Sequence, residues 1–129
     1  MALTEIPTHQ LAAALREGEE ASSIELLNLA SSKDAKIRES LAARTDAPLS
    51  VLIRLAQDSK SGVRTTLAAN PAVGVAVSVL AILASDKDAD VALALVANPA
   101  TPVTTVRALL DHGKKSVRRA AESRLLAAN

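Results

Sequence analysis

The chain has 129 residues, a formal net charge of +1, no cysteine and no aromatic residue. A chain of this length can bury a core of its own, and the missing cysteines exclude disulfides, thiolate metal sites, iron–sulfur clusters and cysteine nucleophiles. The missing Phe, Tyr and Trp side chains exclude base stacking and aromatic cages as means of binding.

The amino-terminal sequence predicts a cytoplasmic location. The first ten residues, MALTEIPTHQ, lack the basic segment followed by an apolar run that a secretory signal needs. Residues 65–85 carry no charge, but Asn70-Pro71 and Gly74 interrupt them and leave about a dozen apolar residues, too few to cross the ~30 Å of a bilayer core. We therefore expect no contact with a membrane.

The first predicted element is a short cap helix over residues 8–17. Leu11 and Leu15 share one of its faces, and Gly18 follows as a helix stop. We expect this helix to close one end of the fold.

The next two elements form a helix pair over about residues 21–44. Ile37 and Leu41 lie at helical spacing in the second helix of this pair, which indicates a buried stripe. A shift of 26 residues aligns Leu41 with Leu67 of the following pair, so the chain repeats itself from this point.

The repeat is clearest in the second and third pairs, over about residues 48–69 and 75–97. A shift of 28 residues superimposes residues 51–71 on residues 79–99 without a gap, and ten positions are identical. They comprise apolar positions at helical spacing, a turn aspartate and a final Asn-Pro pair. Two extra residues before the third pair explain the longer shift. We expect the asparagines to end their helices, because Asn tolerates left-handed backbone geometry.

The last pair covers about residues 102–128. Its Asn-Pro stop is replaced by Arg124-Leu125, so the final helix can continue, with Arg124 as part of a polar outer cap. Repetition at this period is typical of helical solenoids. The sequence therefore predicts one all-α domain over residues 1–129.

The repeat also resembles a known family. The pattern D-x-x-x-x-V-R-x-x-L-A-x-N-P, followed by a short link to Pro and V-L-x-x-L-A-x-D, resembles the leucine-rich repeat variant and, more broadly, HEAT-like helical repeats. The resemblance covers roughly residues 23–122 and implies a right-handed α-solenoid (superhelix) of antiparallel helix pairs, about four repeats with end caps, that serves as a binding scaffold. The fullest copy consists of Asp58, Val63, Arg64, Leu67, Ala68, Asn70 and Pro71.

Charged residues recur at two positions of the repeat. Asp58 and Asp86 lie in the turns between paired helices, and an arginine column is interrupted by Ala92. Each arginine can reach the turn aspartate of its own or the adjacent repeat, so we expect a structural ladder of charge-assisted hydrogen bonds. The arginines of this column are Arg38, Arg64 and Arg118.

The same column allows a second interpretation, in which arginine and lysine side chains contact phosphates. The interruption of the column and the accompanying aspartates favour the structural ladder. The residues that would contact nucleic acid are Arg38, Lys60, Arg64, Lys114, Lys115 and Arg118.

The third repeat is apolar on nearly every side. A helix of this kind is either enclosed or contacts another chain, and enclosure is hard to arrange in a two-layer solenoid. The sequence therefore suggests a surface for a partner or for self-association. Its proposed residues are Val75, Val79, Ile82 and Leu93. The alternative is a well-packed middle repeat whose small apolar residues face water.

Catalytic patterns are poor in this sequence. His9 and His112 are the only histidines and lie at opposite ends of the repeat, which excludes a two-histidine metal site within one chain. We interpret His112 as a surface helix stop beside Gly113. We therefore expect no enzyme activity, no metal and no cofactor.

The sequence favours a non-enzymatic helical-repeat scaffold that mediates protein–protein interaction through an apolar surface of the third repeat. The partner would be a protein or peptide of unknown identity, and a homodimer is one form of such an interaction. The alternative is a module that binds the nucleic-acid backbone through the arginine and lysine face and the basic carboxyl end.

Overall fold

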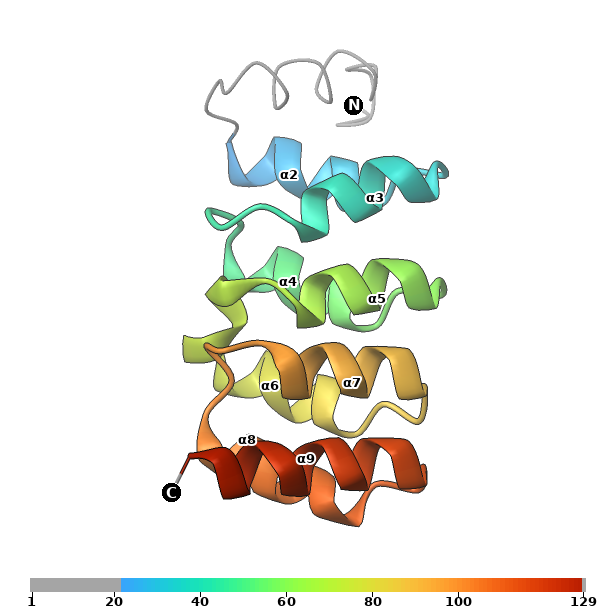
Figure 1. The fold of residues 1–129 in the computed structure, drawn as a ribbon. Coiled ribbons are helices and arrows are strands. Elements are labelled where there is room, and N and C mark those ends of the chain that lie inside the picture. Colours follow the sequence, from blue (N-terminus) through green and yellow to red (C-terminus); the bar gives the residue numbers. More distant parts are fainter. Residues whose placement is uncertain (1–21, 129) are drawn as a thin grey trace.

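The computed structural model describes residues 22–128, which form eight α-helices and two short 3-10 helices, with no strand in this range (Figure 1). The predicted all-α fold is therefore confirmed for these residues, and the predicted cap helix over residues 8–17 lies outside them. The helices form four consecutive pairs: α2 (Ser23–Ala30) with α3 (Ala35–Ala42), α4 (Leu49–Ala56) with α5 (Ser61–Ala68), α6 (Val77–Ala84) with α7 (Ala89–Ala97), and α8 (Val103–Ala108) with α9 (Lys115–Ala127).

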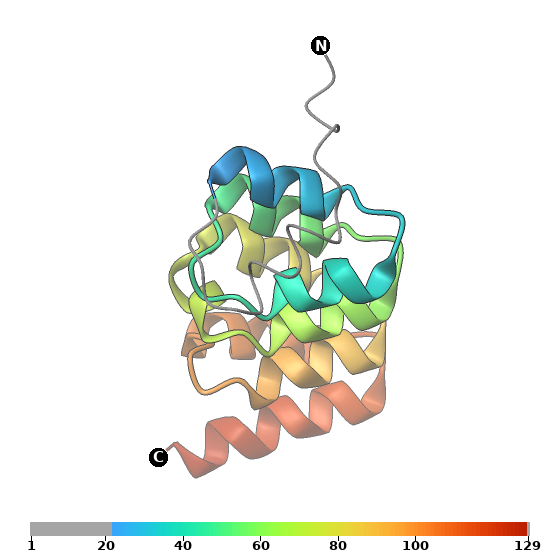
Figure 2. The same ribbon diagram turned by 90° about the horizontal axis from the view of Figure 1, so that it is seen from above.

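The four pairs stack on one another in two layers, as both views show (Figures 1 and 2). Helices α2, α4, α6 and α8 pack in that order and form one layer, called here the A layer. Helices α3, α5, α7 and α9 form the second, or B, layer. The core lies between the layers, because each helix turns one apolar side toward its partner and the other side toward water.

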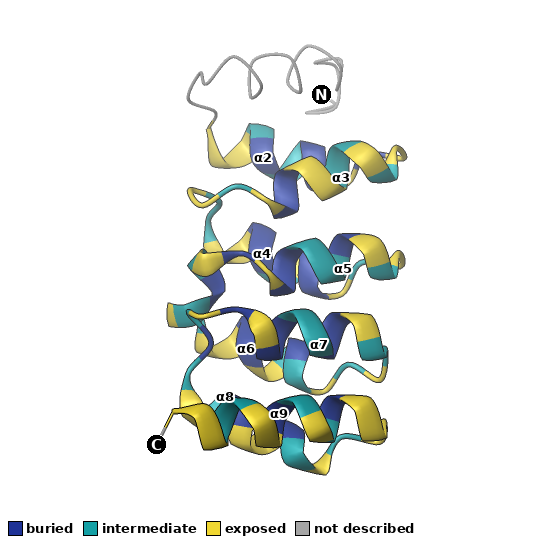
Figure 3. Cartoon of the chain, in the orientation of Figure 1, coloured by how far each residue is buried: buried dark blue, intermediate teal, exposed yellow. Residues whose placement is uncertain are grey.

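Leucines at equivalent positions fill this core. Figure 3 shows that buried residues recur at matching places in successive pairs. In the A layer the column consists of Leu29, Leu55, Leu83 and Leu109, each no more than 1% exposed. In the B layer the corresponding fully buried column consists of Leu41, Leu67, Leu95 and Ala121.

Side-chain caps fix several helix starts. Ser22 and Glu25 form a capping box at α2, and Asp34 and Asp88 accept backbone N–H groups at the starts of α3 and α7. The helices begin and end one to two residues inside most of the predicted ranges, because these caps lie outside the hydrophobic pattern.

The two extra residues before the third pair are accommodated by the 3-10 helix η2 (Pro71–Val75). Val73 is buried, and the backbone at Gly74 lies close to Ala100. A Cβ atom added to Gly74 would lie 2.5 Å from the carbonyl oxygen of Ala100. Glycine is therefore required here by the close approach of two backbone segments.

The last pair differs from the others at both helices. Helix α8 ends after six residues and continues as the 3-10 helix η3 (Leu109–Asp111). Helix α9 has 13 residues, as expected from the missing Asn-Pro stop. Within residues 22–128 no helix combines the length and the apolar character that crossing a bilayer requires.

Candidate functional site

One edge of the stack carries a column of four equivalent turn residues. Ser32, Asp58, Asp86 and His112 each accept the backbone N–H two residues further along, at distances of 3.1, 2.9, 3.0 and 3.0 Å. This bond organises the turn that leads from each A-layer helix into its B-layer partner. Three different residue types thus serve the same structural purpose.

Arginines connect this column from one repeat to the next. The guanidinium of Arg38 donates from Nε to the Asp58 carboxylate at 2.7 Å and from Nη1 to the Ser32 carbonyl at 2.6 Å. Arg64 repeats this arrangement, with Asp86 at 2.6 Å and the Asp58 carbonyl at 2.7 Å. Each arginine therefore joins the carbonyl of its own turn to the carboxylate of the next turn.

The Arg38–Asp58 pair is shielded from water, with side-chain exposures of 11% and 5%. Burial alone would raise the pKa of Asp58, but the hydrogen bonds from Arg38 and from the backbone N–H of Lys60, together with the charges of Arg38 and Arg64, outweigh it. The pKa of Asp58 is therefore lowered, and the same hydrogen bond raises the pKa of Arg38.

His112 replaces the arginine that is missing from the third repeat. Ala92 occupies the arginine position there and is fully buried. The Asp86 carbonyl is instead 2.8 Å from Nε2 of His112, while Nδ1 accepts the backbone N–H of Lys114. Arg118 then donates to the His112 carbonyl at 2.8 Å and completes the column. The interpretation of His112 as a surface helix stop was therefore wrong, because both ring nitrogens are bonded.

A second column runs along the opposite edge of the stack. Asn70 and Asn98 are both 3% exposed, and their backbone is extended, with φ of −77° and −71°. The expectation of left-handed geometry was therefore wrong. The side-chain amide of Asn70 donates to the carbonyls of Ala42 and Arg44 at 2.9 and 2.6 Å.

Asn98 repeats these bonds one helix pair later, to the carbonyls of Ala68 and Asn70 at 2.9 and 3.0 Å. Arg124 occupies the equivalent position of the last repeat and donates to the carbonyls of Val96, Asn98, Pro99 and Thr101. Arg124 is thus bonded into the stack and is not the exposed cap residue that the sequence predicted. The equivalence of Asn98 and Arg124 under the 26-residue shift was visible in the sequence, but the bonds were not.

The candidate nucleic-acid contacts divide into two groups. The arginines Arg38, Arg64 and Arg118 direct their guanidinium groups at carbonyls and carboxylates of the stack. Lys60, Lys114 and Lys115 are exposed at the starts of α5 and α9. The structure therefore leaves three lysines, separated by two repeats, on the surface of this edge.

The four residues suggested as a partner surface do not form one patch. Val79 is fully buried and belongs to the core, so its assignment to a surface was wrong. Ile82 and Leu93 are half-buried, pack against the core and lie in opposite layers. Only Val75 is strongly exposed, at 91%.

A different set of apolar residues is exposed on the A layer. Leu49, Val77 and Val103 are the first residues of α4, α6 and α8, and they are 51%, 79% and 49% exposed. They are equivalent under shifts of 28 and 26 residues, so aligning the repeats at these positions could have identified the column. Three exposed aliphatic side chains therefore follow one line down the stack.

Two depressions flank α6 along this line. A groove of about 880 Å³ lies between α4, η2 and α6 and is lined in part by Leu49, Val75, Val77 and Ala81. A smaller one of about 280 Å³ lies toward α8 and shares Val77 and Ala81 with the first. No residue lining either depression is charged. We call the surface formed by the two depressions and Val103 the apolar face.

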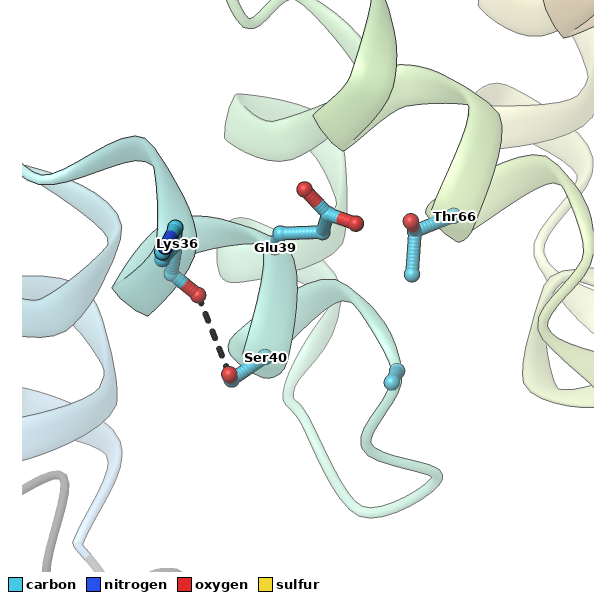
Figure 4. A pocket seen from close by; sticks show the side chains of 5 residues that line it. Lys36, Glu39, Ser40 and Thr66 are labelled. Atoms are coloured by element: carbon cyan, nitrogen blue, oxygen red, sulfur yellow. Dashed lines mark hydrogen bonds between the residues drawn. The ribbon is translucent and has the colours of Figure 1, made fainter.

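The B layer carries a shallower depression of about 470 Å³ between α3 and α5 (Figure 4). The hydroxyl of Ser40 donates to the Lys36 carbonyl, and that of Thr66 donates to the Gly62 carbonyl, both at 3.0 Å. Both hydroxyls are thus bonded to their own helices. Among residues 22–128 no three His, Asp or Glu side chains lie close enough together to hold a metal ion.

Comparisons with family models, with curated proteins and with solved structures find no match to this chain. The candidate site is therefore argued from the chain's own residues.

Proposed function

We propose that this chain is a non-enzymatic helical-repeat scaffold of the leucine-rich-repeat-variant type, a right-handed solenoid that works in the cytoplasm. It binds another protein through the apolar face of the A layer. The observation that carries this proposal is the column of Leu49, Val77 and Val103, exposed beside a groove without a charged lining residue.

Two physical arguments support a binding role for this face. Contiguous apolar surface rimmed by polar residues is costly to leave in water and marks interaction sites. The face also lies on a rigid support, because the arginine and asparagine columns join every described repeat to the next. A surface held in place in this way loses little conformational entropy when a partner binds.

The test is affinity capture from a lysate of cells that make the protein, followed by mass spectrometry. Wild type is compared with Val77→Asp, which introduces charge into the apolar face. Because Val77 is the exposed first residue of α6, where an acidic side chain favours the helix, folding should be unaffected. Ser116→Asp is the matched control, since Ser116 is exposed near the start of α9 in the other layer.

The proposal predicts proteins that wild type and Ser116→Asp retain and that Val77→Asp loses. Equal recovery with all three proteins, each folded by circular dichroism, would contradict it.

A further inference from the structure

We infer that the partner segment bound by the apolar face is an amphipathic helix whose apolar stripe is flanked by two acidic residues. The inference rests on the proposed function and adds the chemistry of the partner. Its basis is the distribution of charge around the apolar face. Helices α4, α6 and α8 together contain only two charged residues, Arg54 and Arg107, and both are exposed.

The two arginines lie at corresponding sides of the apolar face. Arg54 lies in the last turn of α4 and Arg107 in the last turn of α8. Both are therefore at the opposite ends of their helices from Leu49 and Val103, which are the first residues. Five residues of helix separate Leu49 from Arg54, about 7 Å along the axis. The face thus offers an apolar line with a cationic line beside it.

A single helix matches these two lines. Its diameter with side chains is about 10 Å, so one helix lying along the stack can place apolar side chains against Val77 and carboxylates on the flank. Packed helices lie about 8–10 Å apart, which puts α4 and α8 about 16–20 Å from each other across α6. At about 1.5 Å per residue, the two acidic residues of the partner would be about 11–13 positions apart.

The centre of the face requires no charge from the partner. Ile82 occupies the position in α6 that is equivalent to Arg54, and Ala81 occupies the position equivalent to Arg107. Between its two acids the partner helix should therefore be apolar or neutral on this side.

A second copy of the chain fits this face poorly. In a symmetric dimer each face contacts itself, so arginines would meet a surface of α4, α6 and α8 that contains no carboxylate. The same charges favour a partner of opposite sign, because charge complementarity selects among partners and their orientations.

The experiment is a selection from a display library of 16-residue helix-forming peptides. The library fixes a leucine stripe at helical spacing and encodes Glu, Gln or Lys at each flanking position. It is selected separately against the full-length wild type, Val77→Asp, and the double variant Arg54→Glu with Arg107→Glu. Light scattering of the three proteins without peptide gives their oligomeric states.

The inference predicts that wild type enriches Glu at two flanking positions about 11–13 residues apart and that the double variant enriches Lys there. In the selected peptides, each Glu→Gln change should weaken binding to wild type about two- to fivefold, as expected for an exposed ion pair. Val77→Asp should enrich neither class.

The remaining outcomes separate this inference from the proposed function. Peptides that bind wild type but not Val77→Asp, without a charge preference, would overturn the inference and leave the apolar face as a binding surface. A failure to enrich any peptide over Val77→Asp would overturn both. A wild-type dimer that Val77→Asp dissociates would identify a second copy as the occupant and overturn the inference.

Discussion

Nε2 of His112 lies 2.8 Å from the carbonyl oxygen of Asp86 and takes the place of an arginine that the third repeat lacks. A backbone N–H can only donate and a carbonyl can only accept, so His112 carries its hydrogen on Nε2 and a lone pair on Nδ1. The neutral ring thereby accepts like the aspartates of the turn column and donates like the arginines. One substitution, Ala92, is compensated by another one turn later.

This relationship predicts coupling between positions 92 and 112. His112→Asp alone removes the donor to the Asp86 carbonyl, and Ala92→Arg alone buries a guanidinium without a carboxylate to receive it, so each should lower the free energy of unfolding by about 1–3 kcal/mol. The double variant rebuilds the arrangement of Arg64 with Asp86. Its coupling energy, measured in urea unfolding, should be favourable by about 1 kcal/mol or more. Additive effects would contradict the equivalence of the two arrangements.

The asparagine column predicts a strong preference for an amide at Asn98. Asn98→Ala should destabilise the protein by about 1–3 kcal/mol, because the Ala68 and Asn70 carbonyls lose their donor. Asn98→Asp should cost more at pH 7, because it points a buried carboxylate at the same two carbonyls. Thermal or urea unfolding of the two variants gives this order, and equal stability of Asn98→Asp and wild type would rule out the bonds.

The lowered pKa of Asp58 predicts acid sensitivity. The folded protein keeps Asp58 ionised at pH values where the unfolded chain, with an ordinary pKa of 3.8, already binds a proton. The stability that Asp58 contributes is therefore present above pH 3.8 and is lost as pH falls through the folded pKa. Urea unfolding between pH 7 and pH 2 should show wild type losing its advantage over Asp58→Asn in this acidic range. A constant difference would mean that Asp58 is not ion-paired.

Two glycines offer a matched test of the repeat junction. Gly74→Ala should destabilise by about 1–3 kcal/mol, because its Cβ would lie 2.5 Å from the Ala100 carbonyl oxygen and 2.9 Å from the Ala100 Cβ. Gly62→Ala in α5 would meet only the end of the Glu39 side chain, at 3.8 Å, and should stabilise by about 0.5–1 kcal/mol through helix propensity. Calorimetry of both variants tests the sign of each effect, and a neutral Gly74→Ala would contradict the tight contact.

The helix pairs were predictable because their leucines recur at fixed shifts. Leu41, Leu67 and Leu95 align in the sequence and are fully buried in the structure. The asparagine bonds were not predictable by the same reasoning, because Asn98 reaches a carbonyl 30 residues away. A helix stop is a local interpretation, and the true partner lies in another repeat.

The error at Val79 has a similar local cause. The sequence treated residues 75–84 as one helix, whereas η2 ends at Val75 and α6 begins only at Val77. This offset turns Val79 into the core and leaves Val75 and Val77 exposed. The apolar surface was thus expected in the correct repeat, but its residues depended on where one helix begins.

The most direct test of the apolar face is hydrogen–deuterium exchange of the full-length chain with and without a peptide selected on wild type. We predict slower exchange in η2 and in the first turns of α4, α6 and α8, with little change in the B layer. Slower exchange confined to α3, α5, α7 and α9 would contradict the assignment of the binding surface to the A layer.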